Sequence, residues 1–308
     1  MGNISLLQKK DTEIVMKLYR ECFDHAFWIQ EGKLNESVFD APDFCEEASL
    51  LIRDEVTGEP AGCIAVKISN DQKLYPDTAW ITLLMVRPGY RRRGMGRCLY
   101  EVSEKILREK GIRKIYIGQD FANFFSGIPS PKQENEEFFR SCGFILNKDE
   151  HYDLEADIVN NNKIDDFDTS DFEKEFITGI MKKENSSGLL DFLKKEFPGR
   201  WEYEAKVYLG SEGKLENIII MKSAADDAIW GYCMTAVHEG GTGGLGPIGI
   251  ARSIRGRRAG EYILRQSLVQ LRRLGAERVC IDWTILKDFY GQFDFLPVRT
   301  FRSGYKEL

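Results

Sequence analysis

The chain has 308 residues, of which 43% are hydrophobic and 30% are charged, with a formal net charge of -6 at pH 7. This length suits two domains of common size, and the composition is typical of a soluble globular protein. The acidic balance argues against a general nucleic-acid binder, and no apolar stretch approaches the length of a membrane span. The 7 cysteines show no paired metal-ligand spacing, and no secretory signal is evident. We therefore expect a cytoplasmic protein with reduced thiols, no bound metal, and neither nucleic acid nor a membrane as partner.

The first half of the chain predicts a helix followed by short strands. Apolar residues recur at helical spacing around residues 12–23, and segments rich in strand-forming residues follow at 48–55, 61–69 and 77–86. The acidic segment at 39–47 is interpreted as a solvated run of charge, with attraction of an amine as the alternative.

The next segment, RPGYRRRGMGRCLY (87–100), places three arginines beside two glycines in an acidic chain. Apolar residues recur at helical spacing after it, so the loop lies at the N-terminus of a helix. Unpaired N–H groups and the positive end of the helix dipole favour an anion there. Gly94 and Gly96 leave room for that anion to approach the backbone. We interpret the strand, basic loop and helix as a phosphate cradle; a solvated basic turn is the alternative.

The second half begins after a polar segment at 160–171 that has the composition of a linker. Its expected elements are helices at 171–183 and 188–196 and strands at 204–210, 217–223 and 229–238.

The basic loop occurs twice in the sequence. With a shift of 164 positions, residues 86–118 lie over residues 250–282 without a gap, which places Arg91 on Arg255 and Gly96 on Gly260. Such self-similarity indicates a repeated structural unit. The repetition also makes the solvated basic turn a much weaker interpretation, because a chance motif does not recur at fixed spacing.

A second internal match supports the duplication. With a shift of 151 positions, EFFRSCGF (137–144) lies over DFYGQFDF (288–295). We therefore predict one domain duplicated in tandem, with boundaries at 1–159 and 160–308. In each copy the glycine loop follows several strands, whereas a dinucleotide-binding fold opens with its glycine loop. The loop also lacks the Lys-Ser/Thr pair of a nucleoside-triphosphate loop.

RRRGMG (91–96) and FFRSCGF (138–144) resemble two hallmark segments of the GCN5-related N-acetyltransferase superfamily. The resemblance covers nearly the whole chain as two copies. It implies an α/β (α+β) fold in which each domain has a mixed, mostly antiparallel central sheet flanked by helices. It also implies acetyl-CoA as co-substrate and acetyl transfer to a primary amine of a small molecule.

By this resemblance, the backbone of two strand ends and of the two basic loops would hold acetyl-CoA. The segments that match are Leu84, Met85, Val86, Arg91, Arg92, Arg93, Gly94, Met95, Gly96 and Arg97 in the first copy, and Ile248, Ile250, Arg255, Gly256, Arg257, Arg258, Ala259 and Gly260 in the second.

The two copies depart from the family pattern in complementary ways. The family's proton donor to the leaving thiolate is often a tyrosine, and Tyr290 stands at that position in the second copy, whereas Phe139 occupies it in the first. Tyr152 is an alternative acid for the first copy. The second copy has Arg258 in place of the first glycine of its loop. For both tyrosines, packing in the core is the competing interpretation.

The acceptor is hinted at by a looser resemblance. FPGRW (197–201), GLGPIGI (244–250) and IDWTILKDFYGQF (281–293) resemble acetyltransferase domains fused to bacterial N-acetylglucosaminidases, which implies an amino sugar or cell-wall fragment. The second hypothesis is a sensor that holds CoA, or a structural module, with one or both copies catalytically degenerate. We expect a monomer or a homodimer.

Overall fold

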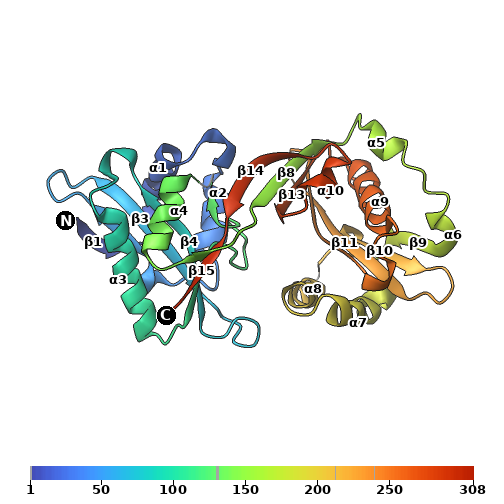
Figure 1. The fold of residues 1–308 in the computed structure, drawn as a ribbon, viewed down its shortest axis with the longest axis horizontal. Helices are drawn as coiled ribbons and strands as arrows, with labels where there is room; N and C mark the ends of the chain where they lie inside the picture. The colour runs from blue at the N-terminus through green and yellow to red at the C-terminus, as the bar shows by residue number, and fades with distance from the viewer. Residues whose placement is uncertain (1, 130–131, 212, 239) are drawn as a thin grey trace. The chain divides into compact units, whose positions relative to one another are not determined.

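The structure of the protein, a computed structural model, describes residues 2–129, 132–211, 213–238 and 240–308. These residues form two compact units (Figure 1). The first unit extends to His151 and also contains Arg299–Leu308, whereas the second is Tyr152–Val298. Within the described ranges, no helix is both long and apolar enough to cross a membrane.

The first unit is built on a seven-stranded sheet. In spatial order its strands are β1 (Asn3–Leu6), β2 (Leu50–Arg53), β3 (Pro60–Ile68), β4 (Thr78–Val86), β5 (Lys114–Ile117), β15 (Gly304–Glu307) and β7 (Ile145–Leu146). β4 and β5 run parallel, while the other neighbours are antiparallel. This confirms the expected mixed, mostly antiparallel sheet.

Helices cover both faces of this sheet. They are α1 (Thr12–Cys22), α2 (Glu31–Leu34), α3 (Met95–Glu109) and α4 (Gln133–Ser141). α1 packs with Leu83 and Met85 of β4 in one apolar cluster, whereas α3 packs with Ile64 and Val66 of β3 in another. Successive strand residues point to opposite faces, so a strand buried on both sides reads as a continuous apolar run. β3 and β4 have that composition because each lies between two helical layers.

The second unit repeats this plan on a second sheet. In spatial order that sheet contains β6 (Ile128–Pro129), β14 (Leu296–Arg302), β8 (His151–Asp157), β13 (Arg278–Thr284), β12 (Thr242–Ile250), β11 (Ile229–Val237), β10 (Ile218–Ser223) and β9 (Phe176–Ile180). Of these, β6 and residues 299–302 of β14 belong to the first unit. The helices of the second unit are α5 (Asn162–Asp165), α6 (Phe172–Glu175), α7 (Ser186–Glu196), α8 (Arg200–Gly210), α9 (Ala259–Arg273) and α10 (Lys287–Gly291). Figure 1 shows α9 on one side of the central strands and α7 and α8 on the other.

The predicted repeat has a structural counterpart in the strand, basic loop and long helix of each half. α9 (Ala259–Arg273) begins and ends 164 residues after α3 (Met95–Glu109), and β12 (Thr242–Ile250) lies 164 residues after β4 (Thr78–Val86). β12 and β13 run parallel, as β4 and β5 do. Both halves therefore place a basic loop between a parallel-paired strand and a long helix.

The units differ from a simple division at residue 160. β8 ends the first repeat in sequence, but it pairs with β13 of the second sheet. β15 ends the second repeat, but it pairs with β5 and β7 of the first sheet. Lys306 of β15 donates to Glu104 of α3 at 2.7 Å and to the Tyr100 hydroxyl at 3.0 Å. Each unit thus takes one strand from the sequence of the other repeat.

Two predicted elements of the second half were wrong. Residues 204–210, predicted as a strand, form the second part of α8, where among them only Ala205 is buried. Helix-forming residues such as Glu204, Ala205 and Leu209 outweigh Val207 there. The helix predicted at 171–183 stops at Glu175, and β9 follows because Phe176–Ile180 is rich in aromatic and β-branched residues that pair with β10. The helix predicted at 188–196 is confirmed as α7.

Candidate active site

The first basic loop leads from β4 to the N-terminus of α3. Gly94 caps the helix in the left-handed region, with φ of +80°. Glycine adopts this conformation without the steric cost that a Cβ brings. A Cβ at Gly94 would meet no atom within 4 Å, so the backbone there is open to a ligand. The first turn of α3 adds N–H groups without intrahelical partners.

Gly96 has a different role from Gly94. A Cβ at Gly96 would lie 3.3 Å from Cγ2 of Val86 and 3.5 Å from the ring of Phe138. The missing side chain therefore lets α3 pack closely against β4 and α4, which fixes the helix terminus beside the strand end.

The arginines of this loop point in different directions. The Arg91 guanidinium donates to the Val86 carbonyl at 2.9 Å, and Arg97 donates to the Ser141 hydroxyl at 2.7 Å. The guanidinium of Arg93 lies 5.3 Å from the centre of the Tyr90 ring. Arg92 has a φ of +61°. All residues predicted for the first cradle line one cavity except Arg93.

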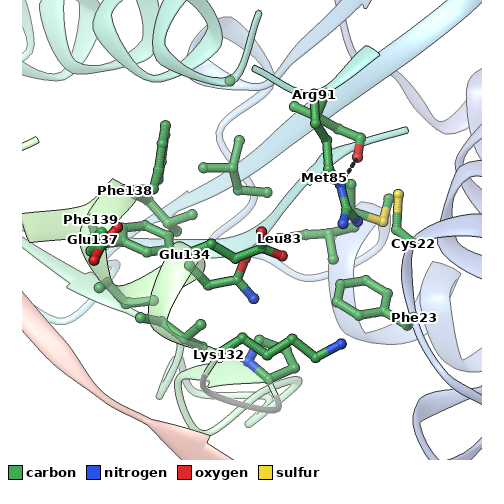
Figure 2. Close-up of a pocket in the computed structure, with 18 of the residues that line it drawn as sticks. Cys22, Phe23, Leu83, Met85, Arg91, Lys132, Glu134, Glu137, Phe138 and Phe139 are labelled. Carbon is green, nitrogen blue, oxygen red and sulfur yellow. Dashed lines mark hydrogen bonds between the residues drawn. The ribbon is translucent and has the colours of Figure 1, made fainter. Parts of the chain in front are cut away.

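This cavity has a volume of about 670 Å³ and lies in the first unit. It extends from the basic loop along β4, and α4 and the end of α1 form its walls. In Figure 2, Phe138 of α4 lies across the cavity from Cys22 and Phe23 at the end of α1. Clefts of roughly 300–1,000 Å³ with mainly apolar walls are typical of small-molecule and cofactor sites.

The strands β4 and β5 separate at this cavity. Their last paired residues are Ile81 and Ile117, whereas β4 continues to Val86. Residues 81–86 line the cavity. The backbone of β4 beyond Ile81 therefore faces the cavity on the side where β5 would otherwise pair with it.

Charged and polar side chains that the sequence prediction missed also reach this cavity. Asp24, Lys132, Glu134 and Glu137 lie on its wall, with Cys22 near Arg91. Burial raises the pKa of the Cys22 thiol, and the adjacent Arg91 opposes that change. No short motif marks these residues, since they converge only when α1 and α4 close over β4.

The residues at the family's acid position differ between the two units. Phe139 is buried beside the cavity and has no proton to donate. Tyr290 is 4% exposed, in edge contact with the rings of Phe289 and Phe295. Burial raises the pKa of Tyr290, and a hydrogen bond with Thr284 opposes that change.

Tyr152 does not lie in the first unit, where it was predicted as an alternative acid. It belongs to the second unit, in β8, because this strand pairs with β13 rather than with the first sheet. Its partner in the strand register is Thr284, the residue that bonds to Tyr290. Both tyrosines named from the sequence therefore approach the same threonine.

The second basic loop keeps the backbone conformation of the first. Arg258 caps α9 with φ of +61°, as Gly94 caps α3, and Gly256 has φ of +78° at the position equivalent to Arg92. Glycine and arginine have thus exchanged places between two left-handed positions. The left-handed arginine costs about 1–2 kcal/mol in each loop.

The arginine side chains of the second loop have partners in the protein. Arg257 pairs with Glu175, and Arg258 pairs with Glu261 at 2.7 Å. Arg255 lies over the ring of Phe197, 5.9 Å from its centre. The strand residues Ile248 and Ile250 flank Gly249 in β12. A Cβ at Gly249 would lie only 2.6 Å from the Phe197 ring. These contacts hold the arginine side chains of the second loop against the protein.

A buried ion pair lies beside the point where β4 and β5 separate. The Lys67 ammonium is 3.0 Å from Oδ1 of Asp120, and both side chains are fully buried. The Thr82 hydroxyl donates to Oδ2 of Asp120 at 2.8 Å. Asp43 lies 3.8 Å from Lys67, and burial raises the pKa of its carboxyl. Asp43 is thus not part of a solvated run of charge, as 39–47 was predicted to be.

Among the residues described, no group of three or more His, Cys, Asp or Glu side chains is arranged to hold a metal ion.

Comparisons with known proteins agree with this geometry. Residues 12–144 match the acetyltransferase (GNAT) family. The probable N-acetyltransferase 14 of Danio rerio is 30% identical over 89 residues, which are 29% of this chain and 27% of that protein. The chain therefore matches about a quarter of the length of this curated relative.

Two solved structures share the fold over nearly the whole chain. The first is a GCN5-related glucosamine N-acetyltransferase region in a fungal multi-domain GH3 β-N-acetylglucosaminidase, with a TM-score of 0.86 and 21% identity over 99% of this chain and 38% of that one. The second is a tandem GNAT protein from the clavulanic acid biosynthesis pathway, with a TM-score of 0.69 and 14% identity over 100% of this chain and 98% of that one. At these identities the likeness concerns the fold alone.

Proposed function

Through residues 12–144 the chain belongs to the acetyltransferase (GNAT) family, and on this premise we propose that it is an acetyl-CoA-dependent N-acetyltransferase. The observation that carries the proposal is the cavity of about 670 Å³ that joins the Gly94 cradle to the open edge of β4. One end of this cavity suits a pyrophosphate, and the other suits a thioester. The acceptor is a primary amine of a small molecule.

The residues of the first unit fit acetyl-CoA by charge and by shape. Around the pyrophosphate, the backbone near Gly94 would donate hydrogen bonds, while Arg91 and Arg92 would supply positive charge. The β4 backbone at Leu84–Val86 would pair with the pantetheine arm. When bound, acetyl-CoA supplies an activated acetyl thioester. The second cradle, with Ala259 and Gly260 at its helix start, is proposed as a second and weaker site.

Transfer to an amine requires three contributions from the protein. The ammonium of the acceptor must lose its proton, the carbonyl must be polarised, and the leaving thiolate must gain a proton. In the first unit Phe139 cannot provide the last of these. Water or a polar group of the cavity wall would therefore protonate the thiolate there. For a reaction in the second unit, we propose Tyr290 as the proton donor and Tyr152 as the alternative.

We propose an amino sugar as the acceptor. One structure of the same fold is described as a glucosamine N-acetyltransferase region, which supports this choice. The first cavity also carries acidic side chains at Asp24, Glu134 and Glu137, which favour a cationic amine. We also propose that the protein works in a reducing compartment such as the cytoplasm. We propose a monomer or a homodimer as the active form.

The second candidate function is a sensor that binds CoA without transferring its acetyl group. Phe139 at the acid position of the first unit and the paired arginines of the second loop are the observations that favour it.

A thiol-release assay distinguishes the two functions. The protein is mixed with acetyl-CoA and a panel of amines that begins with glucosamine, and binding of acetyl-CoA is measured in parallel by calorimetry. Thiol release that depends on an amine supports the transferase, and release with glucosamine supports the amino sugar. If acetyl-CoA binds but none of the amines causes thiol release, the sensor is favoured. Absence of both binding and release would overturn both functions.

A further inference from the structure

The Lys67–Asp120 pair is unusual because it is charged and fully buried, and because Lys67 belongs to β3, a middle strand of the first sheet. Lys67 is the one charged residue in β3 and is 0% exposed, as is Asp120 just beyond β5. Taking two charges out of water costs more than their attraction usually returns. Stability alone is therefore a poor reason for this pair, and a role in fixing local geometry is the better one.

The hydrogen bond from Thr82 connects this pair to an irregular point in β4. Ala65 pairs with Leu83 and Val66 pairs with Ile81, so Thr82 is the extra residue of a bulge in the β3–β4 register. A bulge leaves its extra residue without a ladder partner and turns the strand locally. The Thr82 side chain is held instead by Oδ2 of Asp120 at 2.8 Å.

The bulge coincides with the point where the cavity meets β4. The β4–β5 pairing ends at Ile81, one residue before Thr82, and Thr82 itself lines the cavity. The course of β4 at the cavity therefore depends on Thr82, whose hydroxyl is held by Asp120, which in turn pairs with Lys67.

The second unit lacks all three side chains. Lys67 pairs with Trp80 of β4, and the residue 164 positions after Trp80 is Gly244 of β12, which pairs with Ala236. Ala236 therefore stands at the position of Lys67. By the same shift of 164, Gly246 stands at the position of Thr82 and Thr284 at that of Asp120. The network thus accompanies the unit that contains the cavity of about 670 Å³ and is not required by the fold itself.

We propose that Lys67 and Asp120 are positioning residues that, through Thr82, hold the β4 edge where its backbone polarises the acetyl carbonyl. This inference rests on the proposed function, since it assumes that acetyl-CoA occupies the first cavity. It assigns the reactive geometry to the first unit. Thr82 lies where the paired part of β4 ends, before the strand end at Val86 and the Gly94 cradle, so we expect its loss to act on carbonyl polarisation with little effect on the Kd for acetyl-CoA.

The test uses acetyl-CoA labelled with ¹³C at the acetyl carbonyl, and therefore needs no acceptor. Three variants of the full chain are compared with wild type. Thr82→Val removes the hydroxyl and Thr82→Ser keeps it. Thr78→Val is the matched control, because Thr78 is another buried β4 threonine whose hydroxyl donates to a backbone carbonyl at 2.8 Å but which lies off the cavity.

In wild type, Thr82→Ser and Thr78→Val, we expect the carbonyl resonance of bound acetyl-CoA to lie downfield of the free compound. In Thr82→Val we expect it to return most of the way to the free position, while the Kd for acetyl-CoA stays unchanged. If Thr82→Val loses cooperative unfolding, Asp120→Asn makes the same comparison, because it keeps the shape of the side chain and removes its charge.

A carbonyl resonance that is the same in Thr82→Val and wild type would overturn the inference, and so would an equal displacement in Thr78→Val. A parallel loss of affinity and of the resonance shift would also overturn it, because the network would then act on binding. If wild type binds no acetyl-CoA at all, the proposed function itself fails, and the inference falls with it.

Discussion

Replacing Gly94 by alanine tests the cradle, because the structure supplies a control with the same backbone cost. Gly94 (φ +80°) and Gly111 (φ +81°) lie just before and just after α3, and at both positions a Cβ would meet no atom within 4 Å. An alanine in the left-handed region costs about 1–2 kcal/mol. Both variants should therefore lose similar stability, about 2–4 °C in Tm per kcal/mol for a unit of this size.

The two variants should differ only in acetyl-CoA binding. At Gly94 the new methyl group would occupy the space where a pyrophosphate approaches the backbone, whereas Gly111 lies at the far end of the helix. Losing one hydrogen bond to a charged phosphate costs about 1.5–3 kcal/mol, which is roughly 10- to 150-fold in Kd. Calorimetry with acetyl-CoA on wild type and both variants measures this. Equal affinity in all three proteins would refute the assignment of the cradle.

Three further predictions address the buried pair, the acid and the exchanged strands. Lys67→Met should destabilise the protein to denaturant by about 3–5 kcal/mol, because it removes the ammonium that lies 3.0 Å from the buried Asp120 carboxylate. The double variant Lys67→Met/Asp120→Leu should recover part of this loss. A loss of only about 0–1 kcal/mol, as for an exposed ion pair, would contradict the prediction. Tyr290→Phe should cost about 1 kcal/mol through its lost hydrogen bond to Thr284, and amine-dependent thiol release should fall about 10²–10⁴-fold only if the second unit is catalytic. Deleting Gly304–Leu308 should remove hydrogen-exchange protection from β5 while β10 to β12 keep theirs, because β15 covers the β5 edge; loss confined to the second unit would contradict the strand exchange.

The sequence was informative where one local pattern determined one local structure. The repeated loop predicted α3 and α9. In each case a turn that ends in Gly94 or Arg258 precedes an amphipathic segment, and this local pattern specifies a helix without reference to the rest of the chain. The pairing of the final strands could not be predicted in this way. β8 and β15 have ordinary strand sequences, and only the tertiary structure determines which sheet each one joins.

The candidate site shows the same division. The basic loop and its place at the start of α3 could be predicted, because glycine and arginine before an amphipathic run form a compact local pattern. The buried network was not, since Asp43, Lys67, Thr82 and Asp120 are far apart in sequence and each is common by itself. The sequence did contain one sign of this network. Lys67 is a charged residue within an otherwise apolar strand, and a buried charge requires a buried partner.

A crystal structure of the protein with bound CoA tests the central claim most directly. We predict a pyrophosphate at the backbone of Gly94, with the pantetheine arm along Leu84–Val86. The thiol should lie where β4 and β5 separate, beside Thr82. CoA bound away from this cavity, or bound only at the second loop near Arg258, would contradict the account.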